Sequence, residues 1–293
     1  MNPLNAEELK QKIADLKIWK KRDERAPHKP LTILYALGRL QNENTREFHY
    51  EEAREKLTNL LMEFGPPRKS YHPEQPFVRL QGDGIWKLNQ RVDRPQIKNR
   101  YLIENDVIGG FKESVYDLFK QDATLVREVA EFLLNEHFPD TIHEDILLEV
   151  GLNLGTYRRR TRDPRFREKI LRAYEFSCAV CGFNVRLGHN LVAIEAAHIK
   201  WHQSGGPDEE ENGIALCSLH HKLFDRGVFT FNKSKKLLVS EKAHGTNGFE
   251  EWLLRYHGQP IREPISPHYQ PKQSYLDWHV HEVFKGEARY VSG

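Results

Sequence analysis

The sequence predicts an α+β protein in two parts, a mostly helical N-terminal domain with a small sheet and a C-terminal domain built around cysteine and histidine. Its 293 residues are too many for one average domain. Apolar residues first recur at helical spacing, and beyond Cys178 the pattern changes to Cys and His pairs, glycines and short apolar runs. We therefore expect one domain at 1–150, a basic linker or helix at 151–172 and a second domain at 173–293.

The N-terminal part reads as five helices and two short strands. Leu9, Ile13 and Leu16 share a helix face, and Asn5 is suited to be its N-cap. Pro30 fits the first turn of a second, more apolar helix, and Gly65 with two prolines ends a third. The remaining elements are two strands around the turn "GDG" in 75–89 and helices in 108–122 and 124–138.

The C-terminal part mixes strands with short helices. We expect a helix in 162–176, strands in "NLVAIEAAHI" and "GVFTF", and a helix in "SYLDWHVHEVFKG". Asn212-Gly213 is expected to open a helix that contains Cys217, His220 and His221 and stops at Gly227.

Charge is concentrated in one segment. Residues 153–172 hold eight Lys or Arg and two Asp or Glu, a local charge of +6 in a chain whose net charge is only +2. A basic segment of this kind is suited to bind a polyanion such as DNA, and Arg158, Arg159 and Arg160 are the predicted contacts within it. A solvated linker would show the same charge run.

The chain reads as a cytoplasmic, soluble protein. Three cysteines argue against a disulfide framework, and no apolar run reaches the about 20 residues of a membrane helix. The N-terminus is amphipathic and charged, without the apolar centre of a signal peptide.

Two ligand pairs predict a structural zinc site. Cys178 and Cys181 are spaced C-x2-C, and Cys217 and His220 are spaced C-x2-H after a long loop. Four N and S donors satisfy tetrahedral Zn²⁺ and leave no position for water. The alternative is three reduced cysteines and an unrelated histidine. Between the two pairs lie His198, at the end of an alternating strand, and Asn212, and His221 is rotated by about 100° from His220 on a helix.

This order of residues resembles an HNH endonuclease with the ββα-metal fold. The blocks "EAAHI", "GGPD", "NGIALC" and "LHHKLFDRG" carry the resemblance over roughly residues 170–235. It implies that His198 is the general base, that His221 binds a catalytic Mg²⁺ or Mn²⁺, and that Asn212 holds the loop and orients His198. Taken alone, His198 would be read as an ordinary histidine, and Arg226 is equally a phosphate contact or a helix cap.

One position departs from the family pattern. Many members have Asp or His directly before the general base as a second metal ligand, and this chain has Ala197. Glu195 and Asp208 are the open alternatives for that ligand, although Glu195 is nominally on the opposite strand face from His198.

Two N-terminal segments, "ERAPHKPLTIL" and "RKSYHPEQPFVRLQGDGIW", place proline and aromatic rings among cations. They resemble the sulfur-binding domain of phosphorothioation-dependent restriction endonucleases, over roughly residues 1–150. Sulfur is larger, softer and a poorer hydrogen-bond acceptor than oxygen, so an apolar pocket favours it. The resemblance implies that Pro76 lines this pocket and that His28, Lys29 and Arg79 contact bases and phosphates. The alternative is that these rings pack inward, which is favoured for Phe77 because a strand Phe is usually core.

The sequence therefore favours a modification-dependent endonuclease that acts on double-stranded, phosphorothioated DNA with structural Zn²⁺ and catalytic Mg²⁺ or Mn²⁺. Two alternatives stay open. One is an HNH nuclease that reads a methylated base or no mark, and the other is a zinc-containing DNA-binding protein without cleavage. A homodimer would address both strands, and no motif requires one.

Overall fold

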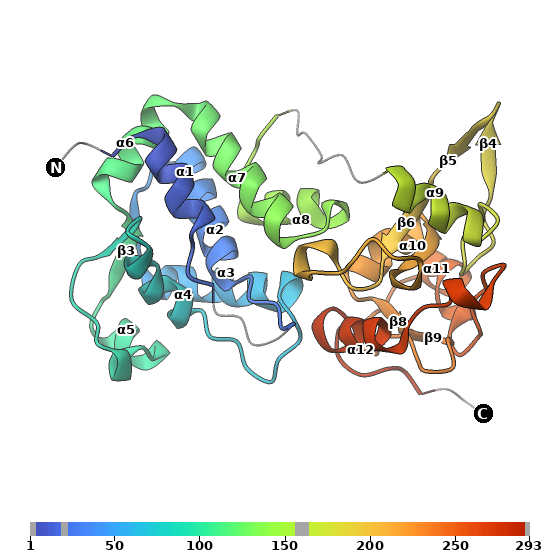
Figure 1. Cartoon of the computed structure of the whole chain (residues 1–293). Helices are drawn as coiled ribbons and strands as arrows, with labels where there is room; N and C mark the ends of the chain where they lie inside the picture. The colour runs from blue at the N-terminus through green and yellow to red at the C-terminus, as the bar shows by residue number, and fades with distance from the viewer. Residues whose placement is uncertain (1–3, 19–22, 156–163, 291–293) are drawn as a thin grey trace. The chain divides into compact units, whose positions relative to one another are not determined.

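The computed structural model describes residues 4–18, 23–155 and 164–290. The chain divides into two compact units, Met1–Arg159 and Arg160–Gly293, and each is described by itself (Figure 1). In the part of the chain that the structure describes, no helix is both long and apolar enough to cross a membrane.

The first unit is mostly helical. Its helices are α1 (Ala6–Ala14), α2 (His28–Glu43), α3 (Tyr50–Phe64), α4 (Glu74–Arg79), α5 (Asn99–Glu104), α6 (Glu113–Gln121), α7 (Ala123–His137) and α8 (His143–Val150). Its strands β1 (Glu47–His49), β2 (Trp86–Leu88) and β3 (Ile108–Phe111) form an antiparallel sheet in the order β1-β3-β2.

The helix signals of the sequence are confirmed for the first three long helices. The Asn5 side chain accepts from the backbone N–H of Glu8, and Glu8 bonds back to the Asn5 N–H, which closes a capping box at α1. Helix α2 is buried along most of its length, and α3 ends at Gly65. Helix α8 was not expected from the sequence.

An aromatic core joins the sheet to the helices. The rings of Phe48, Phe77, Trp86 and Phe111 follow one another with centroid separations of 5.7–5.9 Å, mostly edge to face. All four side chains are buried. The expectation that Phe77 belongs to the core is therefore correct, although its secondary structure differs from the prediction.

The first of the two strands predicted in 75–89 is wrong. Residues Glu74–Arg79 form α4, a 3-10 turn follows at Leu80–Asp83, and only Trp86–Leu88 is a strand. Pro73 and Pro76 explain the difference, because proline is tolerated in a helix's first turn, where its missing N–H has no partner to lose. Likewise, Ile108–Phe111 is strand β3, and the predicted helix begins only at Glu113.

The second unit has short helices and hairpins. Its helices are α9 (Pro164–Ala173), α10 (Ser218–Asp225), α11 (Asn247–Trp252) and α12 (Gln273–Glu282). Its strands pair as antiparallel hairpins, β4 (Val185–Leu187) with β5 (Asn190–Val192), β6 (Ile194–His198) with β7 (Gly213–Cys217), and β8 (Phe229–Phe231) with β9 (Leu237–Val239). Figure 1 shows β4 and β5 projecting from the rest of this unit.

The predicted helix from Asn212 to Gly227 is half wrong. Gly213–Cys217 is strand β7, Cys217 is the N-cap of α10, and the helix runs over Ser218–Asp225. Pairing with β6 decides this segment, because Gly213 lies opposite His198 and Cys217 opposite Ile194. Gly227, with φ of 71°, follows the helix as expected.

The β6–β7 hairpin is packed on both faces. Contacts of β6 and β7 with α9 and with α10 make a three-layered core that includes Ile170, Ile214 and Phe224. A Cβ on Gly213 would lie 2.1 Å from Cδ1 of Ile170, so α9 can approach this closely only because residue 213 is glycine. The ββα unit predicted by the resemblance is therefore present, with α9 as an additional layer.

Candidate functional site

The three cysteines and His220 converge in the second unit. Cys178 and Cys181 precede the β4–β5 hairpin, and Cys217 and His220 lie at the start of α10. The Cys181 and Cys217 sulfurs are 4.0 Å apart, and Nδ1 of His220 lies 3.1 Å and 3.7 Å from the sulfurs of Cys217 and Cys178. Ligands held about 2.3 Å from a tetrahedral zinc ion stand about 3.8 Å apart, so this donor set fits zinc.

The electrostatics of the cluster favour a cation. Hydrogen bonds with Cys181 and Cys217 lower the pKa of Cys178, whereas hydrogen bonds with Cys178 and Cys181 raise the pKa of Cys217. A thiolate therefore forms readily at Cys178, and its negative charge disfavours a second thiolate at Cys217. A bound cation removes that opposition. His220 donates from Nε2 to the Trp252 carbonyl, 2.8 Å away, which leaves Nδ1 as the ligand atom.

Asn212 is completely buried and clamps a loop. Its Oδ1 accepts from the Lys200 N–H at 2.8 Å, and its Nδ2 donates to the carbonyls of Lys200 and Pro207 at 3.0 and 2.9 Å. Its backbone carbonyl accepts from the N–H of Ile199 at 2.9 Å, directly after His198. Both ends of the loop that follows β6 are thus fixed to one side chain.

His198 lies at the end of β6 with its ring held on two sides. The ring stacks on Phe166 of α9, with centroids 4.0 Å apart and planes inclined by 13°. Nε2 is 2.7 Å from Oδ1 of Asp208, a carboxylate on the loop that Asn212 clamps. If the proton lies on Nε2 and is shared with Asp208, Nδ1 is the nitrogen whose lone pair can accept a proton.

His221 lies between two carboxylates. Its Nδ1 is 2.6 Å from Oε2 of Glu195, and its Nε2 is 3.2 Å from Oδ2 of Asp225, one helical turn further along α10. Asp225 and His221 are buried, whereas the Glu195 side chain is 42% exposed. Of these two carboxylates, Glu195 is therefore the one that meets solvent and could admit an ion.

The alternation of β6 explains where these groups point. Glu195 and Ala197 are two residues apart and share the face toward α10, while His198 is on the face toward α9. Asp225 was missed in the sequence, although its spacing of four residues from His221 on a helix was a usable signal.

In the first unit, His28 and Lys29 lie at the start of α2, as predicted. The environments of their two side chains differ. Burial, together with Arg68 and His72 nearby, lowers the pKa of His28 to about 4, so the ring is neutral at neutral pH. Lys29 donates to Asp83 at 2.5 Å and to the Lys17 carbonyl at 2.9 Å. This internal ion pair favours a structural role for Lys29, and its predicted contact with DNA stays a prediction.

Pro76 and Arg79 lie on the short helix α4. Pro76 is buried beside Phe77, and Arg79 is exposed, with Nε donating to Gln75 at 2.9 Å. Pro76 is buried within the unit, and its predicted place in a sulfur pocket stays a prediction. Arg158, Arg159 and Arg160 lie outside the described residues.

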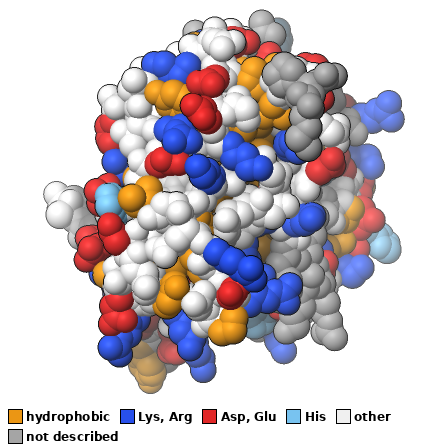
Figure 2. Space-filling view, turned by 90° about the vertical axis from the view of Figure 1, so that its left-hand side faces the viewer, with side chains coloured by type: hydrophobic (Ala, Val, Ile, Leu, Met, Phe, Trp, Pro, Cys, Tyr) orange, Lys and Arg blue, Asp and Glu red, His pale blue; other side chains and the backbone are white. Residues whose placement is uncertain are grey.

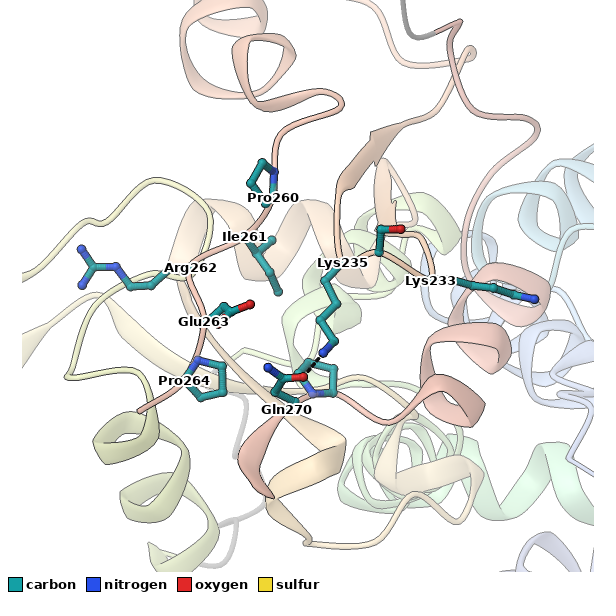
Figure 3. A pocket seen from close by; sticks show the side chains of 10 residues that line it. Lys233, Lys235, Pro260, Ile261, Arg262, Glu263, Pro264 and Gln270 are labelled. Atoms are coloured by element: carbon teal, nitrogen blue, oxygen red, sulfur yellow. Dashed lines mark hydrogen bonds between the residues drawn. The ribbon is translucent and has the colours of Figure 1, made fainter. Parts of the chain in front are cut away.

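Surface charge in the view of Figure 2 is mixed, with Lys and Arg among Asp and Glu and only small apolar patches. In the second unit a cavity of about 170 Å³ is lined mainly by basic and proline side chains, together with Ser234, Ile261, Glu263 and Gln270. There Lys235 donates to Gln270, and Arg262 points away from both (Figure 3). None of the predicted site residues lines this cavity.

Comparisons with known proteins agree with both sequence resemblances. The profile described as "ScoMcrA-like, DNA sulfur-binding domain" matches residues 6–154, and that described as "HNH endonuclease" matches residues 178–232. No curated protein matches the chain.

Solved structures similar to the chain have low identity. The sulfur-binding domain of SprMcrA complexed with phosphorothioated DNA is 23% identical, covers 52% of this chain and 97% of its own, and has a TM-score of 0.44. The corresponding ScoMcrA domain complex is 19% identical, with 48% and 94% covered and a TM-score of 0.42. The Type IV phosphorothioation-dependent restriction endonuclease ScoMcrA is 19% identical, with 56% and 38% covered and a TM-score of 0.40.

Because the first profile covers half of the sequence and the second lies on the Cys and His cluster, the chain belongs to the family of proteins with a ScoMcrA-like DNA sulfur-binding domain, here followed by an HNH domain.

Proposed function

We propose that this protein is an endonuclease that binds phosphorothioated duplex DNA through its first unit and hydrolyses a nearby phosphodiester through its second. The carrying observation is that β6, β7 and α10, joined by a zinc-competent Cys and His cluster, hold His198, Asn212 and His221 on one small framework. In this proposal residues 1–150 read the DNA, 173–293 cut it, and 151–172 with its arginines contacts the backbone.

Zinc is proposed as a structural ion and Mg²⁺ or Mn²⁺ as the catalytic one. The four ligands of the cluster are all protein groups, which suits a structural site. His221 and Glu195 would hold the catalytic ion, because one imidazole nitrogen and one partly exposed carboxylate oxygen already face each other. Such an ion stabilises negative charge on the phosphate and on the leaving oxygen.

Glu195 is the proposed substitute for the family's ligand at position 197. Ala197 has no donor, but Glu195 lies on the same strand face two residues earlier and reaches α10. Buried Asp225 would hold the proton on Nε2 of His221 and so leave Nδ1 to the ion.

His198 is the proposed general base. Its ring would take a proton from water on Nδ1 while Asp208 holds Nε2 and Phe166 fixes the ring plane. The family pattern also places its second metal ligand and its base at adjacent positions, hence on opposite strand faces. The base and the ion would therefore approach the phosphate from two sides.

In the first unit, His28 and Arg79 are proposed DNA contacts. His28 is a neutral, partly exposed donor or acceptor at the start of α2, and the exposed Arg79 guanidinium suits phosphate. Pro76 is proposed to form the floor of the sulfur pocket. Its ring is buried and is not an exposed surface ring.

Digestion of matched duplexes tests this function. One duplex carries a phosphorothioate at a defined step and the other is unmodified, and both are incubated with the full chain and Mn²⁺. We expect cleavage of the modified duplex only. Equal cleavage of both would favour a nuclease that reads no sulfur, and binding without cleavage in Mg²⁺ and Mn²⁺ would favour a DNA-binding protein.

A further inference from the structure

His198, His202 and Asp208 form a second group of possible ligands, separate from the cysteine cluster. Nε2 of His198 is 2.7 Å and Nδ1 of His202 is 4.0 Å from Oδ1 of Asp208. The donor atoms of all three lie within 4.8 Å of one another. We propose that these side chains bind a transition-metal ion, such as Zn²⁺, and that this ion inhibits the nuclease by occupying its general base.

The donor set selects a particular class of ion. Two imidazoles and one carboxylate suit Zn²⁺ and other first-row transition metals, whereas Mg²⁺ prefers oxygen ligands and retains water. The His202 side chain is 58% exposed and that of Asp208 36% exposed, so an ion can enter from solvent and complete its coordination with water. The site is thus chemically distinct from the one proposed for Mg²⁺ or Mn²⁺ at Glu195 and His221.

The surrounding structure holds the ligands in place. His198 is fixed by its stack on Phe166, and the loop carrying His202 is closed by the two bonds between Asn212 and the Lys200 backbone. Gly206 allows the two ends of this loop to approach each other, because a Cβ at position 206 would lie 1.9 Å from the Lys200 carbonyl oxygen. Binding therefore requires only the exposed side chains of His202 and Asp208 to adjust, which keeps the entropic cost small.

Inhibition follows from the chemistry of imidazole and rests on the proposed function. An ion on Nε2 of His198 displaces the shared proton to Nδ1, and a neutral ring bound in this way has no lone pair left to accept one from water. Asp208 is withdrawn from its positioning role at the same time. His202 has no part in the proposed cleavage, so its removal should affect the ion alone.

Ion counting tests the site without any reference to activity. Full-length protein with its cysteine cluster loaded with zinc is titrated with further Zn²⁺, and bound ions are measured by native mass spectrometry and calorimetry. We expect wild type to bind one ion more than His202→Ala, or to bind it at least about tenfold more tightly. The matched control His189→Ala, at the exposed β4–β5 turn, should behave as wild type. Equal zinc binding by wild type and His202→Ala would overturn the site.

A cleavage assay tests the regulation. Mn²⁺-supported cutting by His202→Ala should equal that of wild type without Zn²⁺ and should need at least about tenfold more Zn²⁺ for half inhibition. The same zinc sensitivity in both proteins, or an ion bound through His202 without inhibition, would overturn the inhibitory role. A chain that cuts no substrate would contradict the proposed function, while the ion count would still decide the site.

Discussion

Asp208 contacts the proposed base directly. Its Oδ1 meets Nε2 of His198, and the loop that carries it is clamped by Asn212. Asp208→Asn keeps the size of the side chain but replaces a carboxylate by an amide that can donate to the ring and favour the wrong tautomer. We expect kcat to fall by roughly 10²-fold with little change in KM.

A double variant separates positioning from folding in that experiment. The residual cleavage by His198→Ala, followed in single turnover with enzyme in excess, should not slow further when Asp208→Asn is added, since Asp208 acts through the ring. Additive losses in the two variants would show that Asp208 acts elsewhere.

His28 gives a prediction about pH and stability. Its pKa is about 4 in the folded chain and 6.5 ordinarily, so unfolded protein takes up the proton first as the pH falls. The stability that depends on neutral His28 is present above pH 6.5 and is lost between pH 6.5 and 4, by about 3 kcal/mol. Urea unfolding across this window should show a smaller loss for His28→Gln than for wild type. The exposed control His244→Gln should follow wild type, and identical curves for all three proteins would contradict the burial of His28.

At the scale of elements, zinc is expected to support the whole second unit. The cluster joins the segment before β4 to the start of α10, and α10 carries His221. Chelation, or Cys181→Ser, should lower the melting temperature of this unit by at least about 10 °C. Calorimetry on the full chain should show the first unit's transition unchanged. A chelator that moves neither transition would contradict a structural zinc.

Gly213 controls the packing of α9 on the β6–β7 hairpin. Gly213→Ala places a methyl group against Ile170 and Phe166, the residue on which His198 stacks. We expect destabilisation of about 1–3 kcal/mol and slower cutting. Gly82→Ala is the control, because a Cβ there meets nothing within 4 Å. Unchanged stability in Gly213→Ala would mean that α9 is not held as described.

Sequence patterns succeeded where the signal was local. The N-cap at Asn5 and the Cys and His spacing were predicted correctly, and so was the alternation that ends at His198. They failed at Gly213–Cys217, where pairing with β6 overrides a helix-like start, and at Glu74–Arg79, where a short apolar run resembled a strand. The contact of Glu195 with His221 depends on tertiary packing. From the sequence, Glu195 was therefore only one of two alternatives for the second ligand of the catalytic metal.

At the scale of the whole molecule, the proposed function assigns DNA recognition to the first unit and cleavage to the second. The family profiles fall on separate halves of the chain, and each described unit has its own core. A defect in the second unit should therefore leave DNA binding by the first unit intact. This separation is the property that a modification-dependent endonuclease requires.

The most direct test measures binding and cutting in parallel for wild type and His198→Ala. Each protein is given fluorescent phosphorothioated and plain duplexes, with binding read by anisotropy in Ca²⁺ and cutting by gel in Mn²⁺. We predict that both proteins prefer the phosphorothioated duplex to the same degree and that only wild type cuts it. Cutting by His198→Ala at the wild-type rate, or equal affinity of wild type for the two duplexes, would contradict the proposed division of labour.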